Sequence, residues 1–243
     1  MRFRSAISDA LYRFRYGSNR LSKSENTNVP KLSLYSVYCE SINPEIVRLQ
    51  AAVFAHLGLT LNQVMYAKRD ADFKTRYDGH GEAIERIIVE SAASSMIIFD
   101  IDCIVTSLEF VENVYRPIIE SGALVGPIQV ANHLSDRRPY AAPFALGMSK
   151  SLYRRLGSPR LTQNHHVDVA AILTRECERR GIPVVKFPVT DCIDPKWPLS
   201  GTGAPEFGYG TTYANSIFHA FGVSDGSGEK IFIEKCNSIL RCS

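Results

Sequence analysis

Ser95-Met96-Ile97-Ile98-Phe99-Asp100-Ile101-Asp102 is the stretch that carries the strongest fold information in this 243-residue chain. Residues 95–99 form a strand-length run without polar alternation, which is typical of a strand covered on both faces in a parallel sheet. Two aspartates, Asp100 and Asp102, follow directly. The stretch therefore predicts a buried strand that delivers two carboxylates to one edge of a sheet.

Strand and helix patterns alternate on both sides of this stretch. Strands are expected at residues 32–39, 61–67, 95–99, 123–131, 143–148 and 182–189, and helices at 44–57, from 80 onward, 108–115, 149–156 and 167–180. Asn43-Pro44 is a favourable helix start, and Pro117 is expected to interrupt the pattern before it. The glycine-rich residues 198–212 are expected to form a mobile loop. The alternation predicts an α/β sandwich with a mostly parallel central sheet and flanking helices.

The first 30 residues differ from the rest and are expected to form a basic amphipathic helix followed by a polar linker. Phe3, Ile7, Leu11 and Phe14 recur at helical spacing among arginines. Such a helix, over residues 1–16, either contacts an anionic membrane surface or docks on protein. Residues 31–243 are then expected to form a single domain.

Composition excludes several classes of protein. Apolar residues make up 45% and charged residues 22%, and the net charge is +3, so a disordered chain or a nucleic-acid partner is not expected. No apolar run reaches the roughly 18 residues of a membrane span. The six cysteines lack zinc-site spacing and the N-terminus lacks a signal-peptide core. These features indicate a cytoplasmic protein, with peripheral contact at the inner face of a membrane as an alternative.

Asp100 and Asp102 are the leading candidates for chemistry. Ligands of open α/β sheets bind at the carboxyl ends of strands. Two adjacent carboxylates repel each other there, and a hard divalent cation such as Mg²⁺ or Mn²⁺ relieves that repulsion. The alternative is a pair that caps a loop or binds nearby Lys and Arg.

The sequence resembles nucleotide-sugar-dependent glycosyltransferases of the GT-A fold over about residues 31–190. Residues 97–102 match the DxD motif, which is the specific part of the resemblance. Residues 144–150 with Leu156-Gly157 are similar to an acceptor-side strand and helix. Residues 167–170, followed by residues 179–183, are similar to the passage in inverting members where an acidic residue precedes a helix and a strand. The resemblance implies a GT-A-like, Rossmann-type sandwich.

The resemblance also implies a donor site. Asp100 and Asp102 would hold Mn²⁺ or Mg²⁺ on the diphosphate of a nucleoside diphosphate sugar, and His219 would be the third metal ligand. A histidine hydrogen-bonded within a helix is the alternative for His219. Further nucleotide-sugar contacts would come from residues that follow the first strand or open a helix, namely Glu40, Ser41 and His80. His80 is alternatively an ordinary helix start.

The catalytic base is where the sequence departs from the family. His165-His166 stand near the place of the usual acidic pair, with Asp168 two positions on. Asp168 or His166 would take the proton of the acceptor hydroxyl in an inverting reaction, whereas Asp168 alternatively only caps a helix. A retaining mechanism is the alternative if no base exists here. Gln129 and His133 are candidates for acceptor contacts, and Arg137 and Arg138 are candidates for binding an anionic acceptor.

The resulting hypothesis is metal-dependent transfer of a sugar to a hydroxyl of a glycan or a lipid-linked acceptor. One alternative is a catalytically degenerate domain that binds sugar or a partner protein. Another is a nucleotidyltransferase, although residues 39–43 lack the expected Gly-rich basic loop. A haloacid-dehalogenase-type phosphohydrolase is disfavoured because Cys103-Ile104, rather than Gly-Thr, follow the second aspartate.

Overall fold

The computed structural model describes residues 32–66, 78–134, 137–163, 166–199 and 205–241. In this part of the chain, seven strands form the larger of two sheets: β1 (Leu32–Cys39), β2 (Leu61–Tyr66), β3 (Ser95–Asp100), β5 (Leu124–Gln129), β6 (Tyr140–Ala141), β7 (Ala145–Ser149) and β8 (Val184–Phe187). The order is β2-β1-β3-β7-β5-β6, and β8 pairs with β5. The helix and linker predicted over residues 1–30 lie outside the described residues.

The large sheet is mostly parallel, as the sequence predicts. β1 is parallel to both β2 and β3, and β8 is parallel to β5. β7 runs antiparallel to both β3 and β5, so β5 points the same way as β3. β6 is antiparallel to β5. The carboxyl ends of β1, β2, β3 and β5 therefore meet at one edge.

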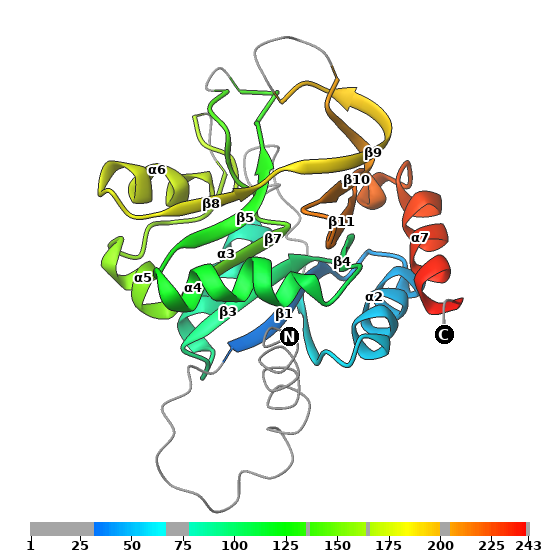
Figure 1. The fold of residues 1–243 in the computed structure, drawn as a ribbon, viewed down its shortest axis with the longest axis horizontal. Coiled ribbons are helices and arrows are strands. Elements are labelled where there is room, and N and C mark those ends of the chain that lie inside the picture. Colours follow the sequence, from blue (N-terminus) through cyan, green and yellow to red (C-terminus); the bar gives the residue numbers. More distant parts are fainter. Residues whose placement is uncertain (1–31, 67–77, 135–136, 164–165, 200–204, 242–243) are drawn as a thin grey trace, which may run out of the picture.

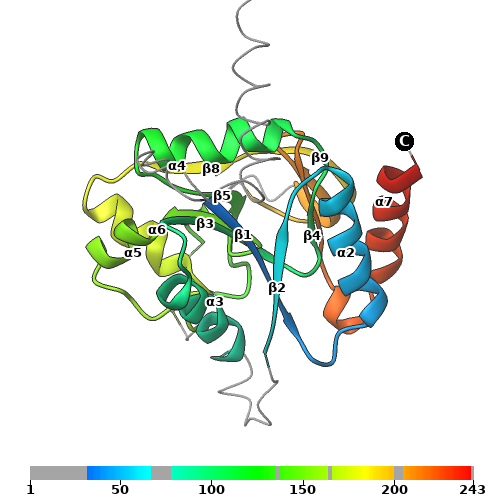
Figure 2. The same cartoon turned by 90° about the horizontal axis from the view of Figure 1, so that it is seen from below.

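Helices cover both faces of this sheet: α2 (Pro44–His56), α3 (Asp78–Glu90), α4 (Arg116–Glu120), α5 (Lys150–Arg155) and α6 (Ala171–Arg179); a further helix, α7 (Glu229–Arg241), packs against α2. Figure 2 shows α4 on one face and α3 and α5 on the other. No helix in the described residues is long and apolar enough to cross a membrane. The prediction of an α/β sandwich with flanking helices is confirmed.

Strand β3 is buried on both faces, which explains its continuous apolar run. Ile97 and Phe99 pack into the core shared with α2, α4 and α7. Met96 and Ile98 point the other way, into the core shared with α3, α5 and α6. All four side chains are 0% exposed. Alternate residues thus enter two different cores, as the pleat of a strand requires.

A second, four-stranded sheet lies beside the first (Figure 1). Its strands are β4 (Cys103–Val105), β11 (Ile217–Ala220), β10 (Phe207–Tyr213) and β9 (Val189–Trp197), in that order and antiparallel. The expectation of a loop over residues 198–212 is therefore wrong from residue 207 onward. Residues 200–204 lie outside the described part.

Two predicted helices differ from the observed ones in their bounds. Helix α6 begins at Ala171 rather than at residue 167, because Ala170 has a left-handed backbone (φ 57) that a helix cannot include. Pro117 does not end the preceding helix. A π-helical turn over Val111–Tyr115 leads into α4, and Pro117 lies in its first turn.

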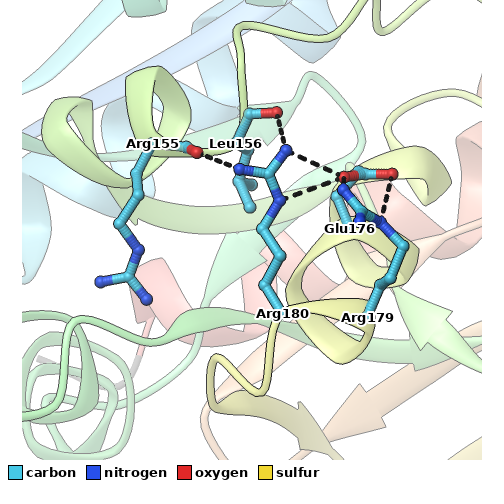
Figure 3. Close-up of polar contacts among 5 residues, drawn as sticks. All are labelled: Arg155, Leu156, Glu176, Arg179 and Arg180. Carbon is cyan, nitrogen blue, oxygen red and sulfur yellow. Dashed lines mark hydrogen bonds and ion pairs between the residues drawn. The ribbon is translucent and has the colours of Figure 1, made fainter.

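Arg180, directly after α6, ties α5 to α6 (Figure 3). Its guanidinium donates to the carbonyls of Arg155 and Leu156, the latter at 3.0 Å. Those carbonyls end α5 and would otherwise lack a partner, as the last carbonyls of any helix do. Its Nε also donates to Glu176 at 3.2 Å. Arg179 contacts the same carboxylate, but from the exposed side of α6.

We expect Arg180→Ala to lower the free energy of unfolding by about 1–2 kcal/mol, because the two carbonyls lose their donor and Glu176 loses one of its two arginine partners. For a domain of this size that corresponds to a fall in Tm of roughly 2–8 °C. Arg179→Ala is the matched control and removes only the exposed ion pair with Glu176. Thermal unfolding of both variants measures the difference, and equal Tm values would contradict the bridging role of Arg180.

Candidate functional site: two carboxylates and a histidine at the sheet edge

The turn that carries Asp100 and Asp102 connects the two sheets. Asp100 is the last residue of β3, and β4 begins at Cys103. The backbone N–H of Asp100 donates to the carbonyl of Phe144 at 3.1 Å, and the carbonyl of Asp102 accepts from the N–H of Ala220 at 2.9 Å. The turn is thus held from the large sheet on one side and from β11 on the other.

Gln50, in α2, fixes the same turn, a role that the sequence analysis missed. This α2 side chain is 0% exposed. Its amide donates to the carbonyls of Asp100 and Cys103, both at 2.8 Å, and its oxygen accepts from Gln63 at 3.2 Å. Because Gln50 lies on the apolar face of a helix, its only sequence signal is a polar residue between Leu49 and Val53.

His219 comes from β11, not from a helix, and faces Asp102. Its Nε2 lies 3.1 Å from Asp102 Oδ1. The ring stacks on Phe144 with centroids 4.0 Å apart and meets the edge of Phe221 at 4.1 Å. The residue is 5% exposed, and Nδ1 has no hydrogen-bond partner among the described residues. The aromatic rings therefore hold the imidazole in one orientation toward the carboxylates.

Asp100, Asp102 and His219 bring one ligand atom each to within 4.8 Å of one another. Two carboxylates and an imidazole are donors that suit a divalent cation such as Mn²⁺. The chemistry of the donor set fits a metal ion, and the clamped imidazole presents its Nε2 to the carboxylates. The three residues predicted as metal ligands are therefore together in space.

His80 pairs with Asp100 from the first turn of α3. Its Nε2 is 2.8 Å from Asp100 Oδ1, and its ring stacks on Tyr66 at the end of β2. Burial lowers the pKa of His80, but Asp100, with smaller contributions from Asp102 and Asp168, raises it above the ordinary value. For Asp100 the effects are reversed. Burial raises the pKa of this carboxylate, but His80 outweighs burial and holds the pKa below its usual value. Each side chain therefore favours the charged form of the other.

A cavity of about 400 Å³ joins these groups to Asp168. The cavity is lined by seven residues that the sequence analysis singled out: His80, Asp100, Asp102, Gln129, His133, Asp168 and His219. It also contains six that the sequence analysis did not assign to a site: Pro143, Phe144, Gln163, Val169, Phe221 and Gly222. Residues from both sheets and from distant parts of the chain thus share one pocket.

Asp168 lies before α6 but is not its N-cap, which is Ala170. Its Oδ1 accepts from the N–H of Val169 at 2.8 Å, and its Oδ2 accepts from the hydroxyl of Tyr140 at 2.6 Å. The helix-cap interpretation of Asp168 is therefore wrong. The carboxylate lines the cavity instead.

Other predicted site residues lie outside the lining of this cavity. His166 is exposed, and its carbonyl accepts from Arg175 at 3.4 Å; His165 is outside the described residues. Glu40 and Ser41 are exposed at the end of β1, on the edge that carries the site. Arg137 and Arg138 are exposed and do not line the cavity.

Comparisons with known proteins give similar solved structures. The family models and the curated proteins contain no match. A mannosyltransferase from Pyrobaculum calidifontis, in complex with GDP-Man and Mn²⁺, matches at 13% identity and TM-score 0.46, over 75% of this chain and 66% of its own. The catalytic domain of Drosophila β1,4-galactosyltransferase 7, with xylobiose, matches at 11% and 0.44, over 79% and 71%. An inositol-1-phosphate CTP transferase from T. maritima matches at 11% and 0.40, over 85% and 76%.

Two of these structures are glycosyltransferases, the class that the sequence resembles.

The His80–Asp100 pair predicts a pH dependence of stability in the metal-free protein. Because the pKa of His80 is raised on folding, its contribution is full below about pH 6.5 and declines as pH rises through the raised value. Because the pKa of Asp100 is lowered, its contribution is lost only in acid, below about pH 4. Urea unfolding in EDTA from pH 5 to 9 is the measurement.

We expect the wild type to lose stability relative to His80→Gln as pH rises above about 6.5, the ordinary histidine pKa. His56→Gln, an exposed histidine of α2, is the control and is expected to follow the wild type. Wild-type and His80→Gln curves that stay parallel over this range would refute the ion pair.

Proposed function

We propose that the protein is a metal-dependent glycosyltransferase that moves a sugar from a nucleoside diphosphate sugar to a hydroxyl of a glycan or a lipid-linked acceptor. The observation that carries the proposal is the composition of one cavity. A triad of metal donors within 4.8 Å and a separate carboxylate, Asp168, line the same space of about 400 Å³. In an inverting transfer from a diphosphate, a cation would neutralise charge on the leaving group and a base would take the proton of the nucleophile.

Asp100, Asp102 and His219 form the donor side of the proposed site. They would hold the cation, which as a Lewis acid would neutralise charge on the departing nucleoside diphosphate. The imidazole favours Mn²⁺ over Mg²⁺, because Mg²⁺ prefers an all-oxygen shell. His80 holds one oxygen of Asp100 and so orients that carboxylate. Glu40 and Ser41 remain candidates for nucleotide contacts, since they follow β1 at the same edge.

Asp168 is the proposed base on the acceptor side. It accepts a proton from the attacking hydroxyl, and the reaction inverts the configuration of the sugar. Gln129 and His133 line the same cavity and supply polar groups for the acceptor. His166 has no part in this proposal, because its side chain is exposed and does not line the cavity.

The cellular site of the reaction is also part of the proposal. A cytoplasmic protein that touches the inner face of a membrane through residues 1–16 would meet a lipid-linked acceptor there. The support is the basic amphipathic pattern of that segment in the sequence.

The test is turnover of nucleoside diphosphate sugars with hydroxyl acceptors in Mn²⁺, in the wild type and in Asp168→Asn. We expect the substitution to lower kcat about 10²–10⁴-fold, because general-base catalysis is lost. Metal-dependent nucleotide binding should persist. Asp191→Asn, an exposed aspartate of β9, is the matched control and is expected to keep full activity.

The other outcomes favour other functions. Unchanged turnover in Asp168→Asn would rule out Asp168 as the general base and favour a retaining mechanism. Nucleotide and metal binding without turnover on any sugar would favour a degenerate binding domain. Consumption of a nucleoside triphosphate with a sugar phosphate would favour a nucleotidyltransferase.

A further inference from the structure

Tyr140 makes the shortest polar contact to the proposed base. Its hydroxyl donates to Asp168 Oδ2 at 2.6 Å and lies 3.2 Å from Gln129 Oε1. The residue is 3% exposed, and its ring packs with Ala131 and Ala171 in a small core cluster. A phenol held this tightly has one orientation available, toward the carboxylate.

The hydroxyl of Tyr140 keeps its proton, and so remains a hydrogen-bond donor to Asp168, at any pH below the ordinary pKa of tyrosine. Burial, and then the charge and hydrogen bond of Asp168, raise the pKa of Tyr140 well above its ordinary value. Tyr140 therefore orients Asp168 without competing with it for a proton.

The backbone around Tyr140 is fixed to the elements that carry the site. Tyr140 is the cross-strand partner of Gln129 in the β5–β6 pair. The N–H of Ala141 donates to Thr174 Oγ1 at 3.0 Å, which joins β6 to α6 in the interior. The strand edge and the helix are thereby kept in register, so the distance between Tyr140 and Asp168 is set by buried contacts.

Among the described residues, each carboxylate oxygen of Asp168 has one fixed donor: the Val169 N–H on Oδ1 and the Tyr140 hydroxyl on Oδ2. A carboxylate accepts about four hydrogen bonds. Two donors leave lone pairs on both oxygens for an incoming hydroxyl, while the plane of the group can no longer rotate.

We propose that Tyr140 is a positioning residue that holds Asp168 in the orientation needed to accept the proton of the acceptor hydroxyl. This inference rests on the proposed function, because it assigns Tyr140 to the same reaction. The hydroxyl of Tyr140 contacts two residues of the proposed acceptor side, Asp168 and Gln129, so we expect donor binding to be unaffected.

The test is a double-mutant cycle of Tyr140→Phe and Asp168→Asn, read as kcat and donor KM. We expect Tyr140→Phe alone to lower kcat roughly tenfold to a hundredfold, since misplacing a reacting group by about 1 Å has that effect. Donor KM and the metal-dependent nucleotide shift in Tm should not change. In the Asp168→Asn background the second substitution should have no further effect on kcat, because the group it positions no longer acts as a base.

Tyr153→Phe is the matched control. Tyr153 is also 3% exposed, and its hydroxyl donates to the carbonyl of Pro159 at 2.9 Å, away from the cavity lining. Tyr153→Phe loses the same hydroxyl and a comparable hydrogen bond as Tyr140→Phe. We therefore expect a similar fall in Tm but an unchanged kcat. Thr174→Val, which releases β6 from α6, is a second variant and should lower kcat in the same direction by a smaller factor.

The outcomes separate this inference from the proposed function. A wild type without turnover on any sugar donor would overturn both. Turnover in the wild type, with equal losses from Tyr140→Phe in the two backgrounds, would show a merely structural role and overturn the inference alone. An unchanged kcat in Tyr140→Phe would do the same.

Discussion

The rest of the site depends on one constraint: two carboxylates repel each other at the end of a strand that is buried on both faces. Asp100 and Asp102 are carried to the sheet edge by β3, whose side chains enter a core on each face. Charges so placed need opposite charge nearby. The fold places a histidine against each: His80 from α3 lies 2.8 Å from Asp100, and His219 from β11 lies within hydrogen-bond distance of Asp102 at 3.1 Å. A cation bound between the carboxylates would complete that compensation.

The larger sheet was predictable because its signals are local. The apolar run of β3 and the Asn43-Pro44 start of α2 each reflect the backbone of a few consecutive residues; Asn43 does accept from the N–H of Glu45 at 3.0 Å. The DxD turn followed from the end of that run. The bounds of α6 could not be predicted, because they depend on a left-handed Ala170 whose N–H donates to the carbonyl of Leu161.

The smaller sheet and its contacts were not predictable, because long-range pairing places them. His219 was singled out by residue type, but its position in β11 depends on pairing with Cys103 across more than a hundred residues. Gln50 and Tyr140 carry no motif. Their roles arise from carbonyls and a carboxylate that approach them only in the folded chain, so a sequence can indicate the charged groups of such a site but not the neutral groups that orient them.

The most direct test of the account is a thermal-shift panel of nucleoside diphosphates, each with Mn²⁺, Mg²⁺ or EDTA, on the wild type, Asp102→Asn and His219→Ala. A diphosphate present at about 100 times its Kd adds about 2.7 kcal/mol to the free energy of unfolding, a shift of a few degrees. If Asp100, Asp102 and His219 hold a metal ion on the diphosphate, one diphosphate gives such a shift. The shift is larger in Mn²⁺, absent in EDTA and lost in both variants. A flat panel for the wild type, or an equal shift in the variants, would contradict this prediction.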